Sequence, residues 1–212
     1  MTHKAIGLLG GTFDPIHNGH LRLAIELYER LDLAEVRLIP AAYPPLRESP
    51  VATAEFRLQM VQAAIVGTVG LTVDARELQR SGPSYMVDTL RSFRAEYPQR
   101  ALCLVLGMDA FMGLPQWHQW EQLIELAHLL IVRRPGNLLP MVHQMRDFLI
   151  AHQTTQRNDL IKKKQGLIWV EEIPALTISA TQIRALLAAR RNPRYLLPMA
   201  VLEFIETHQL YR

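Results

Sequence analysis

Short apolar runs alternate with segments of helical periodicity along almost the whole sequence, and this alternation limits the fold more than any other feature. Runs that suit buried strands lie at residues 6–9, 36–39, 71–73, 101–106, 129–132 and 167–173. The spacing between them predicts helices after residue 18, around 60–65, over 84–97 and 141–149, and from 179 and 198. About six strands alternating with helices predict an α/β fold, a parallel sheet covered on both faces. Right-handed crossovers then favour a doubly wound sheet, which binds ligands at the carboxyl ends of its strands.

The length and composition fit one ordinary globular unit. The chain has 212 residues, of which 49% are hydrophobic and 20% charged, and these values exclude a disordered or collagen-like chain. No repeat or linker divides the sequence, so we expect a single domain over residues 1–212. The net charge of +3 is too small an excess to indicate a nucleic-acid binder.

The cysteine count and the apolar segments bear on location. Cys103 is the only cysteine, so an internal disulfide is impossible, which fits a reducing compartment. The apolar run before Gly10 is shorter than the core of a signal peptide. No segment approaches the ~20 apolar residues of a membrane span. We therefore expect a cytoplasmic protein with neither a membrane nor a nucleic-acid partner.

The junction between the first strand and the first helix carries the richest chemistry. Gly10 and Gly11 allow a tight turn and a close approach of a ligand to the backbone. His17 and His20 then open the helix at a spacing that places both rings on one face, beside amides that favour a phosphate. Imidazole groups at that point could neutralise charge during phosphoryl or nucleotidyl transfer. The junction is not G-x-G-x-x-G, and the sequence has no P-loop, so a nicotinamide-cofactor dehydrogenase and a P-loop phosphotransferase both lose support.

Two other interpretations of this junction stay open. Both histidines could simply cap or pack the helix. Alternatively, Asp14, His17 and His20 could bind zinc or iron, as in a metal-dependent hydrolase, because a carboxylate and two imidazoles are a common ligand set. Pro15 directly after Asp14 predicts, however, that this carboxylate lies before the helix rather than on its face.

A second segment near the C-terminal end has a similar character. Ser179 followed by Gln182 forms a capping box, so Ser179 is expected to begin a helix. That helix start could bind phosphate, with Arg184 adding a positive charge, although many helices begin in this way. The run of three lysines at residues 162–164 is expected to be a solvated loop.

Together the two segments resemble those of the H-x-G-H nucleotidyltransferase superfamily. The first motif is Gly-Thr-Phe-Asp-Pro-x-His-x-Gly-His at residues 11–20, and the second is Ile-Ser-x-Thr-x-Ile-Arg at 178–184. Further matches at residues 83–85, 88–90, 107–109, 117, 133–136 and 210–212 make the whole chain similar to the bacterial nicotinate-mononucleotide adenylyltransferases. The resemblance implies a Rossmann-like nucleotidyltransferase domain.

The resemblance also implies a reaction with two substrates, ATP and nicotinate mononucleotide. The phosphate of nicotinate mononucleotide would attack the α-phosphate of ATP, giving deamido-NAD and pyrophosphate without a covalent enzyme intermediate. Mg²⁺ would enter with ATP rather than bind a metal site of the protein. The alternatives are transfer to another phosphorylated acceptor, such as nicotinamide mononucleotide or phosphopantetheine, and a nucleotide-binding paralogue with weakened turnover.

The family pattern assigns roles to individual positions. The implied catalytic residues are His17, His20 and Arg184. The implied ATP-binding residues are Gly10, Gly11, Thr12, Phe13, His17, His20, Gly107, Asp109, Ile178, Ser179 and Arg184. The implied residues for nicotinate mononucleotide are Arg47, Ser84, Tyr85, Met86, Trp117 and Arg134, with backbone amides around Tyr85 and Trp117 receiving the nicotinate carboxylate.

Three positions depart from that pattern. Ala41 and Leu46 stand where the family has Asn and His, and Met86 stands where it has Thr. Arg47 keeps the positive charge that follows the family His. Leu46 cannot donate a hydrogen bond to a phosphate, whereas Met86 is tolerable if only its backbone amide is used. The departures bear on the acceptor pocket and leave both phosphate-binding motifs intact.

Overall fold

The computed structural model describes residues 4–46, 49–133, 143–174 and 176–212. Its centre is a six-stranded sheet with the order β3-β2-β1-β4-β5-β6, in which every pair is parallel. The strands are β1 (Ile6–Gly11), β2 (Glu35–Pro40), β3 (Leu71–Val73), β4 (Leu102–Gly107), β5 (His128–Arg133) and β6 (Ile168–Glu172). The predicted doubly wound α/β sheet is therefore confirmed.

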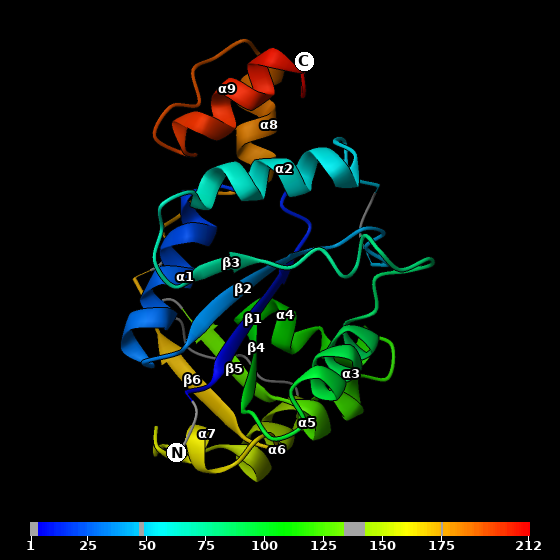
Figure 1. The fold of residues 1–212 in the computed structure, drawn as a ribbon, viewed down its shortest axis with the longest axis vertical. Coiled ribbons are helices and arrows are strands. Elements are labelled where there is room, and N and C mark those ends of the chain that lie inside the picture. The colour runs from blue at the N-terminus through cyan, green and yellow to red at the C-terminus, as the bar shows by residue number, and fades with distance from the viewer. Residues whose placement is uncertain (1–3, 47–48, 134–142, 175) are drawn as a thin grey trace.

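The direction of winding reverses between two central strands. From β1 the chain builds outward to β2 and β3, and it then returns to β4 on the other side of β1 before adding β5 and β6 (Figure 1). In such sheets a crevice opens where neighbouring crossovers leave on opposite faces, beyond the carboxyl ends of the strands. Gly11 and Gly107, the last residues of β1 and β4, lie at that point.

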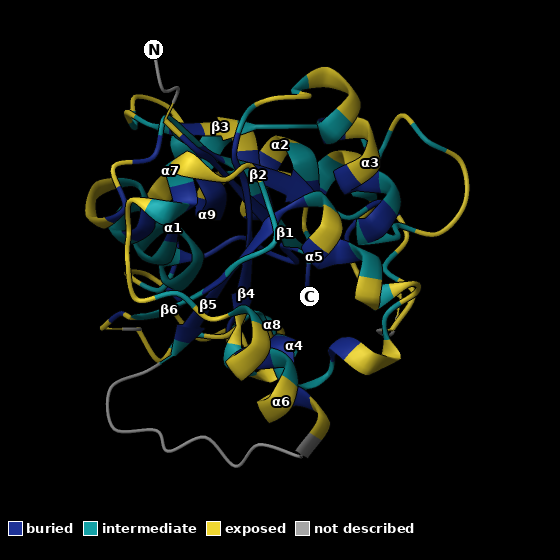
Figure 2. Cartoon of the chain, turned by 90° about the horizontal axis from the view of Figure 1, so that it is seen from below, coloured by how far each residue is buried: buried dark blue, intermediate teal, exposed yellow. Residues whose placement is uncertain are grey.

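Helices cover both faces of the sheet and enclose one apolar core on each. Successive residues of β4 alternate between the cores: Leu102 and Leu104 face one, and Cys103 and Val105 face the other. One core contains buried residues of α1 (Asn18–Arg30), α2 (Ala54–Ile65), α7 (Asp159–Lys162), α8 (Ala180–Ala188) and α9 (Met199–Thr207). The opposite core contains residues of α3 (Met86–Glu96), α4 (Met108–Met112), η1 (Leu114–Gln116), α5 (Leu123–Leu126) and α6 (His143–His152). Figure 2 shows the buried strands between these helices.

The last two helices extend the molecule beyond the sheet. Figure 1 shows α8 and α9 stacked beyond α2, at the end of the longest axis. Phe56 of α2 packs edge-on against Phe204 of α9, with ring centroids 5.7 Å apart. This packing ties the C-terminal end to the segment that follows β2.

The structure departs from the predicted elements mainly at short ones. The helix predicted over 84–97 begins only at Met86, because Tyr85 is extended and its amide donates to the carbonyl of Pro83. The elements α4, α5, α7, η1 and η2 (Trp120–Gln122) were not predicted, since each is too short to show a helical period. The lysines at 162–164 are exposed, as expected, but only the last two lie in a loop, because Lys162 ends α7. No helix in the described part of the chain is long and apolar enough to cross a membrane.

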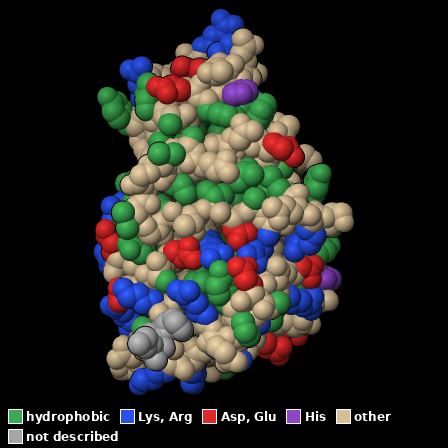
Figure 3. Space-filling view, in the orientation of Figure 1, with side chains coloured by type: hydrophobic (Ala, Val, Ile, Leu, Met, Phe, Trp, Pro, Cys, Tyr) green, Lys and Arg blue, Asp and Glu red, His purple; other side chains and the backbone are tan. Residues whose placement is uncertain are grey.

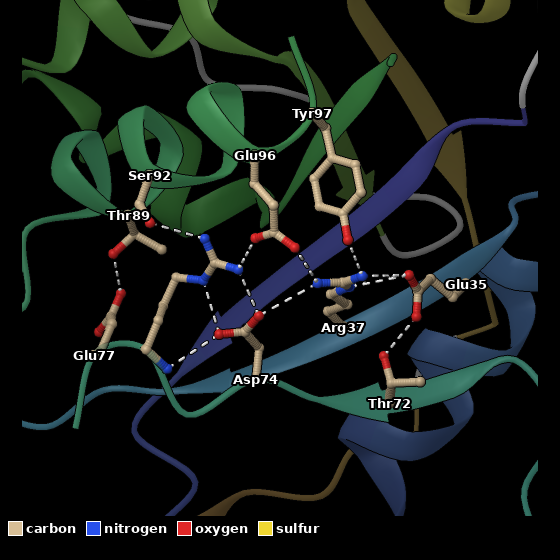
Figure 4. A network of polar contacts seen from close by, with 10 residues as sticks. Glu35, Arg37, Thr72, Asp74, Glu77, Thr89, Ser92, Glu96 and Tyr97 are labelled. Atoms are coloured by element: carbon tan, nitrogen blue, oxygen red, sulfur yellow. Dashed lines mark hydrogen bonds and ion pairs between the residues drawn. The ribbon is translucent and has the colours of Figure 1, made fainter. Parts of the chain in front are cut away.

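Charged side chains gather over the β3 side of the sheet. Figure 3 shows acidic and basic groups mixed across the middle of this face, with hydrophobic groups concentrated nearer α2. Arg76 pairs with Asp74 at 2.8 Å and with Glu96 at 2.9 Å, and Arg37 pairs with Asp74 at 3.4 Å (Figure 4). Arg76 also lies over the ring of Phe93, 3.2 Å from its centroid. These contacts attach the loop after β3 to the outer side of α3.

Candidate active site

The loop between β1 and α1 combines a strained backbone with buried side chains. Phe13 has a φ of 50°, a left-handed conformation that is uncommon for a bulky residue, and its ring is 2% exposed. Asp14 follows Phe13 directly, and His17 lies three residues further along. His17 is the N-cap of α1 and is buried. The prediction that Asp14 precedes the helix is therefore confirmed. Strain of this kind persists only where the surroundings fix it, and it is concentrated at functional sites.

His17 and His20 form a stacked pair at the start of α1. Their ring centroids lie 3.7 Å apart with the planes 21° from parallel, and the ring of Phe13 meets His20 edge-on at 5.1 Å. Burial lowers the pKa of His17 to about 4, so this imidazole is neutral at pH 7 when no ligand is bound. Its Nδ1 atom is buried and has no hydrogen-bond partner within the described residues. A polar atom buried in this way suits a ligand that supplies the missing partner.

Gly19 allows this close arrangement. A Cβ atom at this position would lie 3.0 Å from Nδ1 of His17 and 3.6 Å from Cβ of Ile178. A larger residue would therefore push the histidine pair away from the segment that leads into α8. The H-x-G-H spacing thus has a steric cause, and Gly19 is the point at which the two sequence motifs meet.

The Asp14 carboxylate is fully engaged by the protein. It accepts hydrogen bonds from the amides of Val51 and Ala52, at 2.9 and 3.1 Å, and from the hydroxyl of Tyr211 at 2.7 Å. The open alternative of a zinc or iron site made by Asp14, His17 and His20 is not supported. The part of the chain that the structure describes holds no cluster of three or more His, Cys, Asp or Glu side chains suited to a metal.

Arg57 is a residue of this region that no sequence motif marks. It lies on α2, is 1% exposed, and donates to the backbone carbonyls of Thr12, Ala41, Ala42 and Ala52. Its guanidinium therefore joins the loop after β1 to the loop after β2. Nothing in the sequence shows that this arginine is buried or which carbonyls it reaches.

The second motif comes together with the first. The hydroxyl of Ser179 accepts a hydrogen bond from the Gln182 amide at 3.1 Å, which confirms Ser179 as the N-cap of α8. Arg184, one turn further along, donates to the backbone carbonyl of Asp14 at 2.7 Å across a separation of 170 positions. Two helix N-termini, those of α1 and α8, are thereby joined beside one loop.

Two further predicted positions lie at the carboxyl ends of the central strands. A Cβ atom on Gly10 would lie 2.6 Å from Cε of Met86, so the start of α3 approaches the end of β1 closely. Gly107 is the N-cap of α4, and a Cβ atom at this position would meet no other atom within 4 Å. Asp109 is exposed in the first turn of that helix.

Aromatic residues gather at the start of α3. The ring of Tyr85 stacks on His118, with centroids 4.2 Å apart, and Trp117 packs beside them against the same core. The amides of Tyr85 and Trp117 are already bonded, to the carbonyls of Pro83 and Leu114. The amides of Met86 and His118, one residue further along in each case, have no acceptor among the described residues. The amides of Met86 and His118 are therefore the ones beside Tyr85 and Trp117 that are open to a ligand.

Comparison with known proteins identifies the family. Residues 8–186 match the sequence model of the family described as cytidylyltransferase-like. A protein of Aeromonas hydrophila is 47% identical over 212 residues, covering 100% of this chain and 99% of its own. One of Pseudomonas syringae is 49% identical over 210 residues, covering 99% of this chain and 94% of its own. Both are named probable nicotinate-nucleotide adenylyltransferase. The chain belongs to this adenylyltransferase family, within the cytidylyltransferase-like proteins.

Solved structures share the fold of this adenylyltransferase family member. A nicotinic acid mononucleotide adenylyltransferase of Plasmodium falciparum, complexed with NaAD, has a TM-score of 0.74 and 18% sequence identity. That match covers 99% of this chain and 98% of the other. The family resemblance and the Rossmann-like nucleotidyltransferase fold expected from the motifs are both confirmed.

The structure places two of the three departures from the family pattern in the segment after β2. Leu46 is 54% exposed, and the amide of Ala41 donates to the carbonyl of Gly11. Arg47 and Arg134, two of the residues predicted to contact nicotinate mononucleotide, lie outside the described residues.

Proposed function

We propose that this enzyme transfers the adenylyl group of ATP to nicotinate mononucleotide, forming deamido-NAD and pyrophosphate, a step of NAD biosynthesis. The observation that carries the proposal is the meeting of His17 and His20 on α1 with Ser179 and Arg184 on α8. Two helix N-termini, two imidazoles and a guanidinium converge beside one loop. That arrangement suits a polyphosphate better than any uncharged ligand.

On the ATP side, His17, His20 and Arg184 act on the phosphates. The imidazoles face charge that develops on the pyrophosphate leaving group, and the phosphates provide the partner that Nδ1 of His17 lacks. Ser179 and the first amides of α8 hold the outer phosphates. The remaining ATP contacts that we propose come from Gly10, Gly11, Thr12, Phe13, Gly107, Asp109 and Ile178, with the Asp109 carboxylate accepting from the ribose.

The chemistry needs no protein nucleophile. An oxygen of the acceptor phosphate forms a bond to the α-phosphorus of ATP while the bond between that phosphorus and the pyrophosphate oxygen breaks. The protein contributes by holding both phosphates in line and by stabilising charge. The substrate is MgATP, in which the metal is held mainly by phosphate and water.

On the acceptor side, we assign the nicotinate carboxylate to the amides of Met86 and His118. Both amides lie at the stacked Tyr85–His118 pair, and Met86 begins an 11-residue helix whose N-terminus favours an anion. Trp117 provides a ring for stacking on the pyridine, and Arg47 and Arg134 supply positive charge to the acceptor. Ser84 is proposed to contact the acceptor as well, and its hydroxyl is held in place by a hydrogen bond that it accepts from the Tyr43 amide at 3.1 Å.

We also propose that residues 1–212 work as one domain in the cytoplasm. The site needs segments from both ends of the chain, and the free thiol of Cys103, which is buried in β4, suits a reducing compartment.

The proposed reaction is tested with ATP that carries a label on one of its phosphates. With ATP labelled at the α-phosphate, the label should move into a dinucleotide when nicotinate mononucleotide is present, and label from the γ-phosphate should appear in pyrophosphate. The same incubation with phosphopantetheine distinguishes another acceptor. ATP binding without label transfer to any acceptor would identify a binding protein instead.

A further inference from the structure

Glu77 is a buried carboxylate next to the acceptor side of the site, and no motif marks it. It lies in the loop between β3 and α3 and is 3% exposed. The hydroxyl of Thr89, in the first turns of α3, donates to it at 2.6 Å (Figure 4). The Ser84 hydroxyl and the Arg80 guanidinium lie near this carboxyl and favour its charged form. Burial raises the pKa of the Glu77 carboxyl, and these three groups oppose that rise.

The partners of Glu77 belong to the turn that begins α3. Two hydrogen bonds hold Ser84 to Tyr43. The Tyr43 amide donates to the Ser84 hydroxyl at 3.1 Å, and the Ser84 amide donates to the Tyr43 carbonyl at 2.9 Å. Arg80 donates to the carbonyl of Tyr85 at 3.3 Å. The Thr89 hydroxyl that donates to Glu77 also lies 3.4 Å from the Tyr85 carbonyl and accepts a hydrogen bond from Arg80 at 3.4 Å. Through Thr89, the Glu77 carboxylate is therefore joined to the first turns of α3 and to the Ser84–Tyr85 turn.

The attachment of the loop after β3 to α3 does not by itself explain why the Glu77 carboxylate is buried. The same loop is already fixed to α3 by the ion pairs of Arg76 with Asp74 and with Glu96, whose side chain is 47% exposed (Figure 4). A carboxylate costs free energy to bury and is retained where its hydrogen bonds fix a particular geometry. The geometry that Glu77 fixes is that of the Ser84–Tyr85 turn, which is followed at once by the free amide of Met86.

We propose that Glu77 is a positioning residue for the acceptor, which sets the place of the Met86 amide and of the Tyr85 ring through Ser84, Thr89 and Arg80. The inference rests on the proposed function, because it concerns the acceptor of that reaction. Glu77 touches neither substrate itself. Its removal should weaken the recognition of a carboxylate-bearing acceptor while leaving the ATP side unchanged.

The experiment compares Glu77→Ala and Glu77→Gln with the unmodified enzyme and with Glu96→Gln as the control. Glu96 is also a carboxylate that ties α3 to the loop after β3, but it does so on the outer side. For each protein, kcat and the KM values for ATP, nicotinate mononucleotide and nicotinamide mononucleotide are measured, together with the melting temperature. Thr89→Val, which removes the 2.6 Å partner and keeps Glu77, provides a second route to the same effect.

We expect Glu77→Ala to raise the KM for nicotinate mononucleotide by roughly tenfold or more, since a charged hydrogen-bond acceptor is lost. The KM for ATP should change less than about twofold, and the preference for the acid acceptor over the amide should fall. Glu77→Gln and Thr89→Val should shift the same ratio less, and Glu96→Gln should not shift it.

Other outcomes contradict the proposal. If both KM values and the acid preference stay unchanged in folded Glu77 variants, or if the KM for ATP rises as much as that for the acceptor, Glu77 has no positioning role. If Glu77→Ala does not fold, Glu77→Gln and Thr89→Val decide between these results. Lack of turnover by the unmodified enzyme would instead overturn the proposed function. The kinetics of the unmodified enzyme therefore separate failure of the proposed function from failure of the role proposed for Glu77.

Discussion

The hydroxyl of Tyr211 donates a 2.7 Å hydrogen bond to the carboxylate of Asp14, which lies 197 positions earlier in the sequence. Both residues are buried, and burial raises the pKa of the Tyr211 phenol, so the hydroxyl remains a donor over the whole physiological range. Asp14 in turn fixes the loop that ends at His17. The C-terminal end of the chain thus helps to hold the loop that we propose binds phosphate.

Replacing Tyr211 by Phe should destabilise the protein and slow transfer. The free energy of unfolding should fall by about 1–2 kcal/mol, because one buried hydrogen bond to a carboxylate is lost. The rate should fall severalfold as the Asp14 loop loosens. Urea denaturation and initial rates measure both effects. Tyr195→Phe is the matched control, since Tyr195 is 89% exposed, and equal effects of the two substitutions would contradict this role for Tyr211.

His20→Ala should abolish measurable transfer while the fold stays intact. Loss of one group that stabilises developing charge lowers rates by about 10²–10³. Circular dichroism and melting temperature check the fold, and pyrophosphate release checks the rate. A His20→Ala enzyme that releases pyrophosphate at the unmodified rate would show that the mechanism proposed for the histidine pair is wrong.

The stability of the protein should depend on pH through His17. Burial holds the pKa of His17 at about 4 in the folded state, whereas the unfolded side chain titrates near 6.5. As the pH falls from 6.5 to 4, the unfolded chain therefore takes up a proton that the folded chain does not. By linkage, the free energy of unfolding falls by up to about 3 kcal/mol over this interval from His17 alone.

His17→Gln isolates this effect from that of His128, whose pKa burial also lowers. As the pH falls from 6.5 to 4, the unfolding free energy of the unmodified protein should therefore fall more than that of His17→Gln. A difference that is the same at pH 7 and pH 4.5 would contradict the lowered pKa of His17.

Leu46→His restores the residue that the family pattern has at this position. Since the side chain of Leu46 is 54% exposed, the change should cost little stability, within about 0.5 kcal/mol. Transfer should stay equal or increase, because an imidazole can donate to a phosphate. Steady-state kinetics with nicotinate mononucleotide measure the effect, and a large loss of activity would show that the pocket has adapted to Leu46.

The sequence predicts the parallel sheet and the capped start of α8 because both leave local signals, whereas the joint role of the two motifs came from the family resemblance. The apolar runs matched every strand of the described sheet, and the capping box at Ser179 was found where predicted. The metal alternative could not be dismissed from spacing alone. Only the structure shows that the Asp14 carboxylate accepts hydrogen bonds from the Ala52 amide and the Tyr211 hydroxyl.

Residues that act through distant contacts remained hidden for a physical reason. Arg57 and Glu77 are charged residues in ordinary sequence surroundings, and charged residues are usually solvated. Their burial depends on carbonyl and hydroxyl groups that the fold brings to them, such as Thr12 and Thr89. Similarly, the helix period could not reveal that the Tyr85 amide is occupied and that of Met86 is open.

The most direct test of the proposed reaction is the initial rate of pyrophosphate release with ATP and Mg²⁺, measured with nicotinate mononucleotide and with nicotinamide mononucleotide. The dinucleotide product is confirmed by mass. Clear turnover with a higher kcat/KM for the acid acceptor is the predicted result, and it would show that Ala41, Leu46 and Met86 are tolerated. No turnover with either acceptor, despite measurable ATP binding, would contradict the proposed reaction.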